Sequence, residues 1–492
     1  MVIPTKPHAA LLASPGLGHL IPMIQLANRL TTHHSFHVTI FVVSMDPNLN
    51  ISTLLPNQSN YTNSTLYDLI VLPYVDSSTQ MGPTDKIMTR LAIMMRDYIP
   101  SLRSELGSME HNPTLLVVDL FGTEFLNLAN EFNMVKYVYI PSNAWFLAET
   151  ICVPHLDKQV KHVGPLYIPG CKRVEYDDIL DPVFDPENRD YDEYVRIAID
   201  IGTADGLLVN TWEELEPKTL SSLRNNKKLR EMFNKPVYPV GPLVRPVRPE
   251  CLGGELLMWL NNQPKESVLY VSFGSGGTLS SKQTIELAWG LEKSKQKFIW
   301  VLRPPIEHDG AGALFHAMEG QDQAISQYLP DGFLTQISNL GKVIPMWAPQ
   351  TEILAHPSIG GFISHCGWNS TLESLSSGVP IIAWPLYAEQ NMNAALMDEE
   401  IGVAIRPKVL PTKGLVSREE IKNMIIKIMV DVEGFEIRRR VKEVKKCAKK
   451  ALTIEGSTCK WFAQLAKNCE IKLRSQSQKA EEMAVGHINI IN

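Results

Sequence analysis

Short apolar runs rich in β-branched residues alternate with helical patterns along the first half of the chain. The runs span residues 8–16, 36–44, 114–120 and 135–141, and turn residues follow each of them. After the first run, the sequence IPMIQLANRLTTH repeats its apolar positions at the spacing of an amphipathic helix. This alternation is typical of βαβ units, in which helices cover both faces of a parallel sheet. The first half therefore predicts an α/β domain.

The same alternation begins again after residues 236–254, a segment dense in proline and glycine. The buried strands predicted in this second half are SVLYVSFGSGG, KFIWVLRP, GKVIPMW, GGFISHCG and VPIIAWP. We therefore predict two doubly wound α/β domains that face each other. Ligands of open α/β sheets bind beyond the carboxyl ends of the strands, which makes the cleft between the domains the expected site.

Chain length supports two domains, because 492 residues exceed the roughly 100 to 200 that one core usually organises. We place the amino-terminal domain at residues 1–240, the linker at 241–254 and the carboxy-terminal domain at 255–470. Residues 471–492 are expected to return to the amino-terminal domain.

Three segments lie outside this alternation. Residues 48–65 and 305–328 are polar or rich in Gly and Ala, and we expect loops there. Residues 436–450 carry many Lys and Arg side chains, which could mark a nucleic-acid patch or a targeting signal. A charged run of this kind is more often the solvated face of a helix, and we favour this interpretation.

Composition describes an ordinary soluble protein. Hydrophobic residues make up 44% and charged residues 20% of the chain, and the net charge is -6. This balance gives no reason to expect nucleic acid or an anionic membrane as a partner. No apolar stretch approaches the roughly 20 residues that cross a bilayer, and prolines and glycines interrupt any signal peptide. We therefore expect a cytoplasmic protein with no integral membrane segment.

Cysteines and glycosylation sequons agree with a cytoplasmic location. The seven cysteines include no C-x-x-C pair, which indicates reduced thiols rather than disulfides or a zinc site. Sequons begin at Asn50, Asn57, Asn60, Asn63 and Asn369. The last of these lies within a cluster of polar residues, where a glycan would block access.

This polar cluster lies where the predicted strand GGFIS ends and a helix begins. Ser370 is a good N-cap for that helix, and Glu373, three residues later, fits a capping box. A helix start also presents unpaired N–H groups and a partial positive charge, which suit a phosphate. Gly367 would let the backbone approach such an anion, while His365 and Asn369 would add donors. Capping and anion binding both remain open at this point.

A second loop, residues 272–278, places glycines and hydroxyl groups directly after another buried strand. It could be a flexible turn, or it could supply donors to the same anion. Two donor loops in one domain favour a diphosphate as the ligand.

In the first half, His19 follows a glycine-rich turn and precedes a helix. A lone histidine is most often a surface residue, but the positive end of a helix disfavours its protonated form. His19 is therefore expected to stay neutral and able to accept a proton. Asp119 stands near the end of the run 114–120, where it could cap the next element.

Dinucleotide binding is a rival interpretation of the turn before His19. Gly16 and Gly18 begin the pattern G-x-G-x-x-G, and Asp46 after the second strand could hold a ribose. The pattern needs a third glycine for close packing of helix against strand, and the chain has Ile21 there. A dehydrogenase is therefore not expected.

Residues 347–390, WAPQTEILAHPSIGGFISHCGWNSTLESLSSGVPIIAWPLYAEQ, resemble the signature box of plant family-1 UDP-glycosyltransferases. Further segments extend the resemblance over nearly the whole chain, namely SPGLGHLIP, LLVVDLFGTE, VNTWEELE and YVSFGSGGTLS. The resemblance implies the GT-B fold, in which two Rossmann-like domains with parallel sheets face each other across a cleft. It also implies that the first domain binds the acceptor and the second binds the UDP-sugar.

The resemblance assigns roles in nucleotide binding to residues of the carboxy-terminal half. Trp347 would stack on uracil, and Ala348 would pair with the base through its backbone. Gln350 and Glu373 would hold the ribose hydroxyls. The residues expected at the two phosphates are Ser275, His365, Asn369 and Ser370.

Three residues at the end of the box would face the sugar, namely Trp384, Glu389 and Gln390. Glu389 stands where many relatives have Asp, and it keeps the same acceptor chemistry. Gln390 accompanies glucose in the family, so UDP-glucose is the expected donor, as a co-substrate and with no cofactor. The aromatic side chains of Trp347, Trp368 and Trp384 could each be core residues instead, and Trp368 is expected to stay structural.

The resemblance also implies a mechanism. Asp119 would contact His19, fix its tautomer and stabilise its charge as it takes the proton of the acceptor. The acceptor oxygen would attack C1 of the sugar while UDP leaves, and this single displacement would give a β-glucoside. Nothing resembles the paired carboxylates of a double displacement. No D-x-D motif is evident, so donors at a helix end would stabilise UDP without a metal.

The acceptor site is expected in the amino-terminal half, where Phe121, Trp145 and Phe146 would suit a flat aromatic ring. Each of the three is equally good core material. The segments VVDLFGTEFLNLANEF and PLYAEQNMNA most resemble the branch that acts on simple phenols, of the hydroquinone and monolignol glucosyltransferase type.

The expected protein is thus a monomeric hexosyltransferase whose partners are UDP-glucose and a small aromatic acceptor. The alternative is a non-catalytic protein that binds the nucleotide sugar and sequesters a phenolic. The presence of both His19 and Asp119 argues against this alternative.

Overall fold

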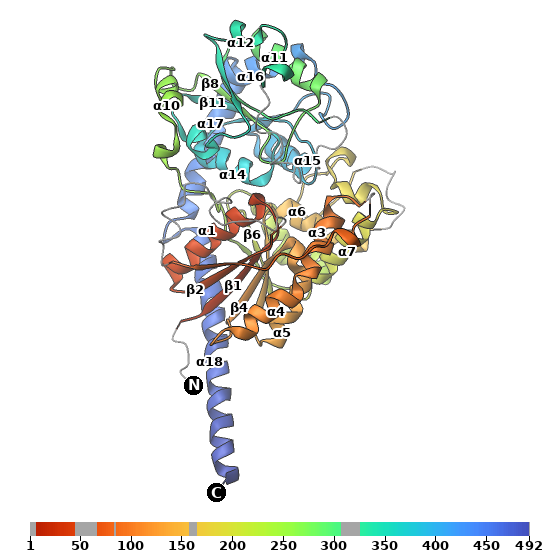
Figure 1. Cartoon of the computed structure of the whole chain (residues 1–492), viewed down its shortest axis with the longest axis vertical. Coiled ribbons are helices and arrows are strands. Elements are labelled where there is room, and N and C mark those ends of the chain that lie inside the picture. Colours follow the sequence, from red (N-terminus) through yellow and green to blue (C-terminus); the bar gives the residue numbers. More distant parts are fainter. Residues whose placement is uncertain (1–5, 45–65, 83–84, 157–164, 307–324, 492) are drawn as a thin grey trace. The chain divides into compact units, whose positions relative to one another are not determined.

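The structure of the chain is a computed structural model (Figure 1). It describes residues 6–44, 66–82, 85–156, 165–306 and 325–491, with the side chains of the last helix described through residue 475. The predicted loop 48–65 lies outside these residues, and so does most of the predicted loop 305–328.

The chain divides into two compact units, each built from more than one stretch of sequence. Unit 1 consists of Met1–Leu156, Pro186–Leu243 and Ala451–Asn492. Unit 2 consists of Asp157–Asp185 and Val244–Lys450. The units differ from the predicted domains at two places, because the stretch beginning at residue 157 joins unit 2 and the return to unit 1 begins at residue 451.

Hydrophobic packing explains the early return of the chain to unit 1. The last helix, α18 (Ser457–Ile491), contributes Phe462, Leu465, Ala466 and Cys469 to the core cluster that contains the strands of unit 1. A helical spacing of apolar residues reveals that one face is buried, but it does not reveal the surface that covers it.

Unit 1 contains a seven-stranded sheet in the order β3-β2-β1-β4-β5-β6-β7, with all neighbours parallel. The strands are β1 (His8–Ala13), β2 (His37–Val42), β3 (Asp68–Val71), β4 (Leu115–Asp119), β5 (Val135–Ile140), β6 (Gly206–Val209) and β7 (Val237–Pro239). Strands β1 and β4 pair directly, with Leu12 opposite Val118. Because the chain order reverses between β1 and β4, this is the topological switch point of the sheet.

Helices surround the sheet of unit 1 (Figure 1). They are α1 (Leu17–His34), η1 (Ser78–Gln80), α3 (Ile87–Asp97), α4 (Ile99–Ser108), η2 (Leu120–Phe125), α5 (Leu126–Glu131), α6 (Ala144–Cys152), η3 (Val153–His155), α7 (Arg189–Ile201), α8 (Pro217–Asn225) and α9 (Lys227–Met232). Helix α1 packs on β1, on β2 and on α18. Every residue of β1 after His8 is fully buried, as expected for a parallel strand that is covered on both faces.

Unit 2 repeats the same topology with six parallel strands, in the order β10-β9-β8-β11-β12-β13. The strands are β8 (Val268–Ser272), β9 (Lys297–Leu302), β10 (Gly341–Pro345), β11 (Ile359–Ser364), β12 (Ile381–Ala383) and β13 (Ala404–Ile405). Its switch point lies between β8 and β11, which pair from Val268 to Ser272.

The helices of unit 2 include the described part of the stretch that begins at residue 157. They are η5 (Tyr176–Asp178), η6 (Asp181–Phe184), η7 (Pro249–Cys251), α10 (Gly254–Asn261), α11 (Ser281–Ser294), η9 (Ile325–Tyr328), α12 (Phe333–Gln336), α13 (Gln350–Ala355), α14 (Trp368–Ser377), α15 (Gln390–Ala395), the π-helical η10 (Leu396–Ile401), α16 (Arg418–Met429) and α17 (Val432–Ala451). Helix α17 contains the basic run 436–450, which confirms that this run is helical.

Each strand predicted from an apolar run is present in the structure. The strands that the pattern did not predict are β3, β6, β7 and β13, which have only two to four residues each.

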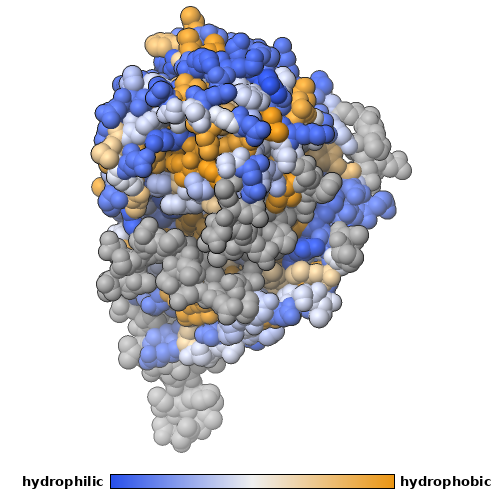
Figure 2. Space-filling model, turned by 45° about the horizontal axis from the view of Figure 1, so that its top comes forward, coloured by the Kyte–Doolittle hydropathy of each residue, from blue (hydrophilic) through white to orange (hydrophobic). Residues whose placement is uncertain are grey.

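Hydrophobic side chains on the face shown in Figure 2 lie among hydrophilic ones. None of the helices that the structure describes is both long enough and apolar enough to cross a membrane.

Candidate active site

His19 and Asp119 form a direct contact at the switch point of unit 1. His19 lies in the first turn of α1, which begins after Gly16 at a φ of 104°. Asp119 is the last residue of β4, the neighbour of β1 in the sheet. The topology therefore brings the two residues together, with His19 Nδ1 2.9 Å from Asp119 Oδ2.

The carboxylate of Asp119 is held by Ser14 as well as by His19. Asp119 is fully buried, and the backbone N–H of Ser14 donates to its Oδ2 at 2.9 Å. The hydroxyl of Ser14 donates to Oδ1. Since an ionised carboxylate only accepts hydrogen bonds, the contact favours a proton on Nδ1 of His19. Nε2 then keeps a lone pair and can accept a proton.

The imidazole of His19 is open to solvent on one side, with 22% of its side chain exposed. The ring of Phe121, in η2, meets it edge-on with a centroid separation of 5.5 Å. Trp145 and Phe146, at the start of α6, are buried with 2% and 6% of their surfaces exposed. Of the three predicted acceptor residues, Phe121 is thus the one that the structure places against His19.

Glu216 is a buried carboxylate beside α6 that no sequence pattern marks as functional. Its Oε1 accepts from the backbone N–H of Ala144 at 3.0 Å and from that of Trp145 at 3.2 Å. Asn143 caps the same helix by accepting from the N–H of Phe146. Burial raises the pKa of Glu216 from 4.5 to about 7, although these hydrogen bonds oppose the shift.

This pKa predicts a pH-dependent stability that Glu216→Gln should remove. Between pH 4.5 and about 7 the folded protein holds a proton that the unfolded chain has released. The free energy of unfolding therefore falls as pH rises through this interval, by about 3 kcal/mol in total. In urea unfolding, the native protein should lose stability between pH 5 and pH 8 while E216Q does not, so the stability of the variant relative to the native protein should increase with pH. The exposed Glu231→Gln serves as a control, and a difference between native protein and E216Q that stays constant with pH contradicts the assignment.

In unit 2, two loops meet at the switch point around the ring of His365. One follows β8 and contains Gly274, and the other follows β11 and contains Gly367. A Cβ atom at position 274 would lie 2.6 Å from the ring of His365, and one at position 367 would lie 2.5 Å from its Nε2. Gly274 also has a φ of 78°, which favours glycine. The absence of both side chains therefore allows the two loops to close on His365.

The ring of His365 is 9% exposed, and its burial lowers the pKa from 6.5 to about 4. His365 is therefore neutral at pH 7 and can donate through one ring nitrogen. Its Nδ1 has no hydrogen-bond partner among the residues that the structure describes.

The start of α14 is open, so of the two alternatives for Ser370 and Glu373 the capping box is not observed. The N-cap is Gly367, no side chain caps the helix, and Ser370 is the third helical residue. A cap at Ser370 requires the helix to begin at residue 371, but the helix begins three residues earlier, at Trp368. Gln350 instead donates to Ser370 Oγ at 2.9 Å and to Glu373 Oε2 at 2.8 Å. An uncapped helix start directs N–H groups and positive potential at any anion in front of it.

Glu373 is buried, and burial raises its pKa, opposed first by the nearby charge of Arg245. The Nη2 atom of Arg245 lies 3.8 Å from Glu373 Oε1. Arg245 stands in the proline-rich segment that the sequence pattern marks only as a linker, so its place beside Glu373 could not be predicted.

The three tryptophans of the box occupy different environments. Trp347 is 57% exposed and follows Met346, whose φ is 62°. Trp368 is 2% exposed, and Trp384 is fully buried with its ring edge-on to Phe273 at 6.2 Å. Trp347 is thus the one that presents an open aromatic surface.

Hydrogen bonds fix the loop that precedes α15. Oε1 of Gln390 accepts from the N–H of Leu386 at 2.9 Å and from that of Tyr387 at 3.2 Å. Asn393 donates to the carbonyl of Cys366 at 2.8 Å and to Glu389 Oε1 at 3.4 Å. The loop with Glu389 and Gln390 is thereby linked to the loop after β11.

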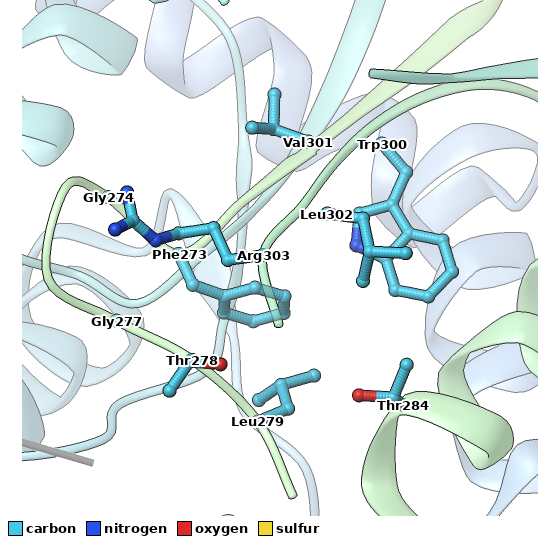
Figure 3. Close-up of a pocket in the computed structure, with 10 residues that line it drawn as sticks. All are labelled: Phe273, Gly274, Gly277, Thr278, Leu279, Thr284, Trp300, Val301, Leu302 and Arg303. Atoms are coloured by element: carbon cyan, nitrogen blue, oxygen red, sulfur yellow. The ribbon is translucent and has the colours of Figure 1, made fainter. Parts of the chain in front are cut away.

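A small pocket adjoins the glycine-rich loop after β8 (Figure 3). It is lined by Gly274 and Gly277 of the loop and by Trp300, Leu302 and Arg303 of the β9 segment. The guanidinium of Arg303 points toward the end of the loop at Gly274. Ser275, predicted at the phosphates, stands in this loop and is exposed.

Comparisons with known proteins agree with this arrangement. A family described as UDP-glucoronosyl and UDP-glucosyl transferase matches residues 243–431. Anthocyanidin 3-O-glucosyltransferase 5 of Manihot esculenta is 50% identical over 96% of this chain and 97% of its own. The chain belongs to the plant family-1 UDP-glycosyltransferases.

Two further relatives support this membership. The hydroquinone glucosyltransferase of Rauvolfia serpentina is 41% identical to this glycosyltransferase over 95% of this chain and 99% of its own. The crystal structure of TcCGT1 in complex with UDP has 44% sequence identity and a TM-score of 0.88, and it covers 95% of this chain and 100% of the other. The two parallel-sheet units of the glycosyltransferase are therefore those of the GT-B fold, as predicted.

Proposed function

We propose that this glycosyltransferase transfers glucose from UDP-glucose to the hydroxyl group of a small phenolic, with inversion, to give a β-glucoside and UDP. The observation that carries the proposal is the contact between His19 and the buried Asp119 at the carboxyl ends of neighbouring strands. The names of the two relatives described as glucosyltransferases support glucose as the sugar.

The donor is proposed to bind at the switch point of unit 2. The exposed ring of Trp347 supplies a stacking surface for uracil, and the backbone of Ala348 pairs with the base. Gln350 and Glu373, already hydrogen-bonded to each other, hold the ribose hydroxyls. The open start of α14 binds the diphosphate, and the side chains that also donate to the phosphates are those of Ser275, His365, Asn369 and Ser370.

The sugar is proposed to meet Glu389 and Gln390. Their loop is held in one conformation by hydrogen bonds to its backbone, so the two side chains are presented in a fixed geometry. Trp384 was predicted to face the sugar as well. Its complete burial within the core of unit 2 supports a structural role, in which it supports the loop that follows it.

His19 is proposed to act as the general base through Nε2. A phenol with a pKa near 10 and an imidazole near 6.5 differ by about 5 kcal/mol in proton affinity, so complete deprotonation before attack is costly. The proton is therefore transferred while the phenol oxygen attacks C1 and the bond from C1 to the UDP oxygen breaks. Asp119 stabilises the imidazolium that forms. The neutral His365 and the start of α14 stabilise the charge on departing UDP without any proton transfer.

The acceptor class is proposed from the relatives and from one ring contact. The relatives named for anthocyanidin and hydroquinone both imply a phenolic acceptor. Phe121 places an aromatic ring beside His19, where it can pack against a flat acceptor. Trp145 and Phe146 are buried, so they are proposed to support the walls of this site rather than to contact the acceptor over a wide surface.

We further propose that the protein acts as a cytoplasmic monomer. All seven cysteines are free, which supports a reducing compartment. Light scattering after gel filtration tests the monomer directly.

The test of the proposed function is incubation with UDP-glucose and a panel of phenols, hydroquinone among them. We expect release of UDP together with a phenolic glucoside whose anomeric proton shows the large coupling of the β anomer. The competing candidate, a non-catalytic binder, predicts saturable binding of a phenol in calorimetry with no UDP formed. An α-glucoside would contradict the single displacement.

A further inference from the structure

One stretch of unit 2 comes from the first half of the chain. The sequence from 157 to 185 lies between α6 and α7 of unit 1, yet it belongs to unit 2. Its described part, residues 165–185, contains the short helices η5 and η6 and no strand of either sheet. Residues 165–185 therefore belong to unit 2 without adding a strand to its sheet or a long helix to its surface.

The first anchor of this stretch is an ion pair with little access to solvent. Asp178, 3% exposed, accepts from Arg406 Nη1 at 2.6 Å. Arg406 is 16% exposed and also pairs with Glu399 and, at 3.5 Å, with Asp398 of η10. Lys172 donates to the carbonyl of Glu399. The π-helical turn that follows α15 is therefore fastened to this stretch.

A second set of contacts of this stretch is more exposed to solvent. Lys413 lies 3.0 Å from Asp177 and 5.8 Å from the centre of the Phe184 ring. The rings of Tyr176 and Phe184 meet edge-on at 4.8 Å, which connects η5 to η6. Lys413 and Asp177 are both about half exposed, so their ion pair contributes little, and the less exposed pair of Asp178 with Arg406 is the one that anchors the stretch.

Asp181, at the start of η6, connects this stretch to the loop that precedes α15. Its Oδ2 accepts from the backbone N–H of Ala388 at 2.8 Å. Gln390 accepts from the N–H groups of Leu386 and Tyr387, so three successive N–H groups are each bound by a side-chain oxygen. Gln390, at the start of α15, accepts two of these bonds, and Asp181 of the stretch accepts the third.

Ala388 needs this support because of its backbone. Its φ of 57° lies in the left-handed region, which costs a residue with a Cβ atom about 1–2 kcal/mol. Such a conformation persists only where surrounding contacts determine it. The residue after it, Glu389, is the N-cap of α15, and Gln390 is the first residue of that helix. The conformation of Ala388 therefore sets the directions of both side chains.

We propose that residues 172–185 form a strap that positions the sugar-facing loop 386–390, with Asp181 as the positioning residue. Asp181 acts through the N–H of Ala388 and need not touch the substrate. The proposal deepens the proposed function, because it rests on Glu389 and Gln390 as the residues that recognise the sugar. The nucleotide is held by other parts of unit 2, so the strap governs recognition of the hexose and leaves recognition of UDP unchanged.

The test compares Asp181→Ala with Asp181→Asn and with the control Asp177→Ala. D177A removes a carboxylate of the same strap whose partner, Lys413, lies outside the loop. We expect D181A to raise the KM for UDP-glucose about tenfold and to lower the preference for UDP-glucose over UDP-galactose by a similar factor, as loss of one charge-assisted hydrogen bond implies. The Kd for UDP should stay within twofold. D181N keeps an acceptor oxygen and should recover most of the preference, and D177A should behave as the native protein.

Hydrogen exchange supplies a readout that does not depend on transfer. Amide exchange of the peptide that covers residues 384–390 should become faster in D181A and stay unchanged in D177A. Exchange that is equal in D181A and native protein overturns the strap, as does an equal loss of affinity for UDP and UDP-glucose. If the native protein transfers no glucose, the proposed function fails, while the exchange result still decides whether Asp181 holds the loop.

Discussion

Replacing His19 with alanine is expected to lower kcat for glucosyl transfer by about 10²–10⁴-fold, the usual contribution of a general base. The Kd for UDP should remain within twofold, because the proposed nucleotide residues all lie in unit 2. Phenols of lower pKa should be affected less by H19A, since an acceptor that ionises more readily depends less on the base. Initial rates with a series of substituted phenols, together with calorimetry of UDP binding, measure both effects.

A matched control for H19A is His33→Ala in the same helix, where the imidazole is exposed and lies in the last turn rather than the first. H33A should keep full activity. Equal rates for H19A and native protein at saturating substrates would remove His19 from the mechanism. A loss of activity that is the same for every phenol would indicate that the substitution had disturbed the fold of α1 rather than the proton transfer.

The location of the candidate site could be predicted from sequence because it follows from strand order. Asp119 was placed near the end of a strand and His19 after one, and in a doubly wound sheet such ends meet at the switch point. The same rule places the loop with Gly274 next to the loop with Gly367 in unit 2. Apolar runs were enough to find these strands, since a parallel strand buried on both faces is almost continuously hydrophobic.

The details that could not be predicted depend on contacts between distant residues. Ser14 donates to Asp119, and Glu216 accepts from the first N–H groups of α6. Neither residue belongs to a pattern that marks a functional residue. Arg245 lies in an apparent linker, yet it stands beside Glu373. The membership of Asp181 in unit 2 follows from tertiary packing, which no periodicity within 157–185 reveals.

The absence of a cap at Ser370 has a local cause. Ser370 followed by Glu373 matches a capping box, but Gly367 already ends the preceding loop and the helix begins at Trp368. A cap at Ser370 would have used the hydroxyl to satisfy an N–H of the helix. Because the helix starts earlier, the hydroxyl is available to other donors, and Gln350 supplies one.

The close approach of two loops around His365 leads to the prediction with the largest expected effect on donor binding. Gly274→Ala would place a methyl group 2.6 Å from the ring of His365, a distance at which one of them must move. Displacing His365 removes a donor from the proposed phosphate site, and a lost hydrogen bond to a charged group costs about 1.5–3 kcal/mol. We expect the Kd for UDP to rise about 10- to 100-fold in calorimetry.

Backbone strain alone must be separated from this overlap, because position 274 has a φ of 78° and any alanine there is strained. Gly332→Ala is the matched control, since Gly332 has a φ of 72° in the same unit and nothing within 4 Å of an added methyl group. Both variants should lose about 1–2 kcal/mol of stability from the left-handed conformation. Only G274A should lose affinity for UDP. Equal affinities in the two variants would show that the ring of His365 does not need the space that Gly274 provides, and the anion site would then have to rest on the open start of α14 alone.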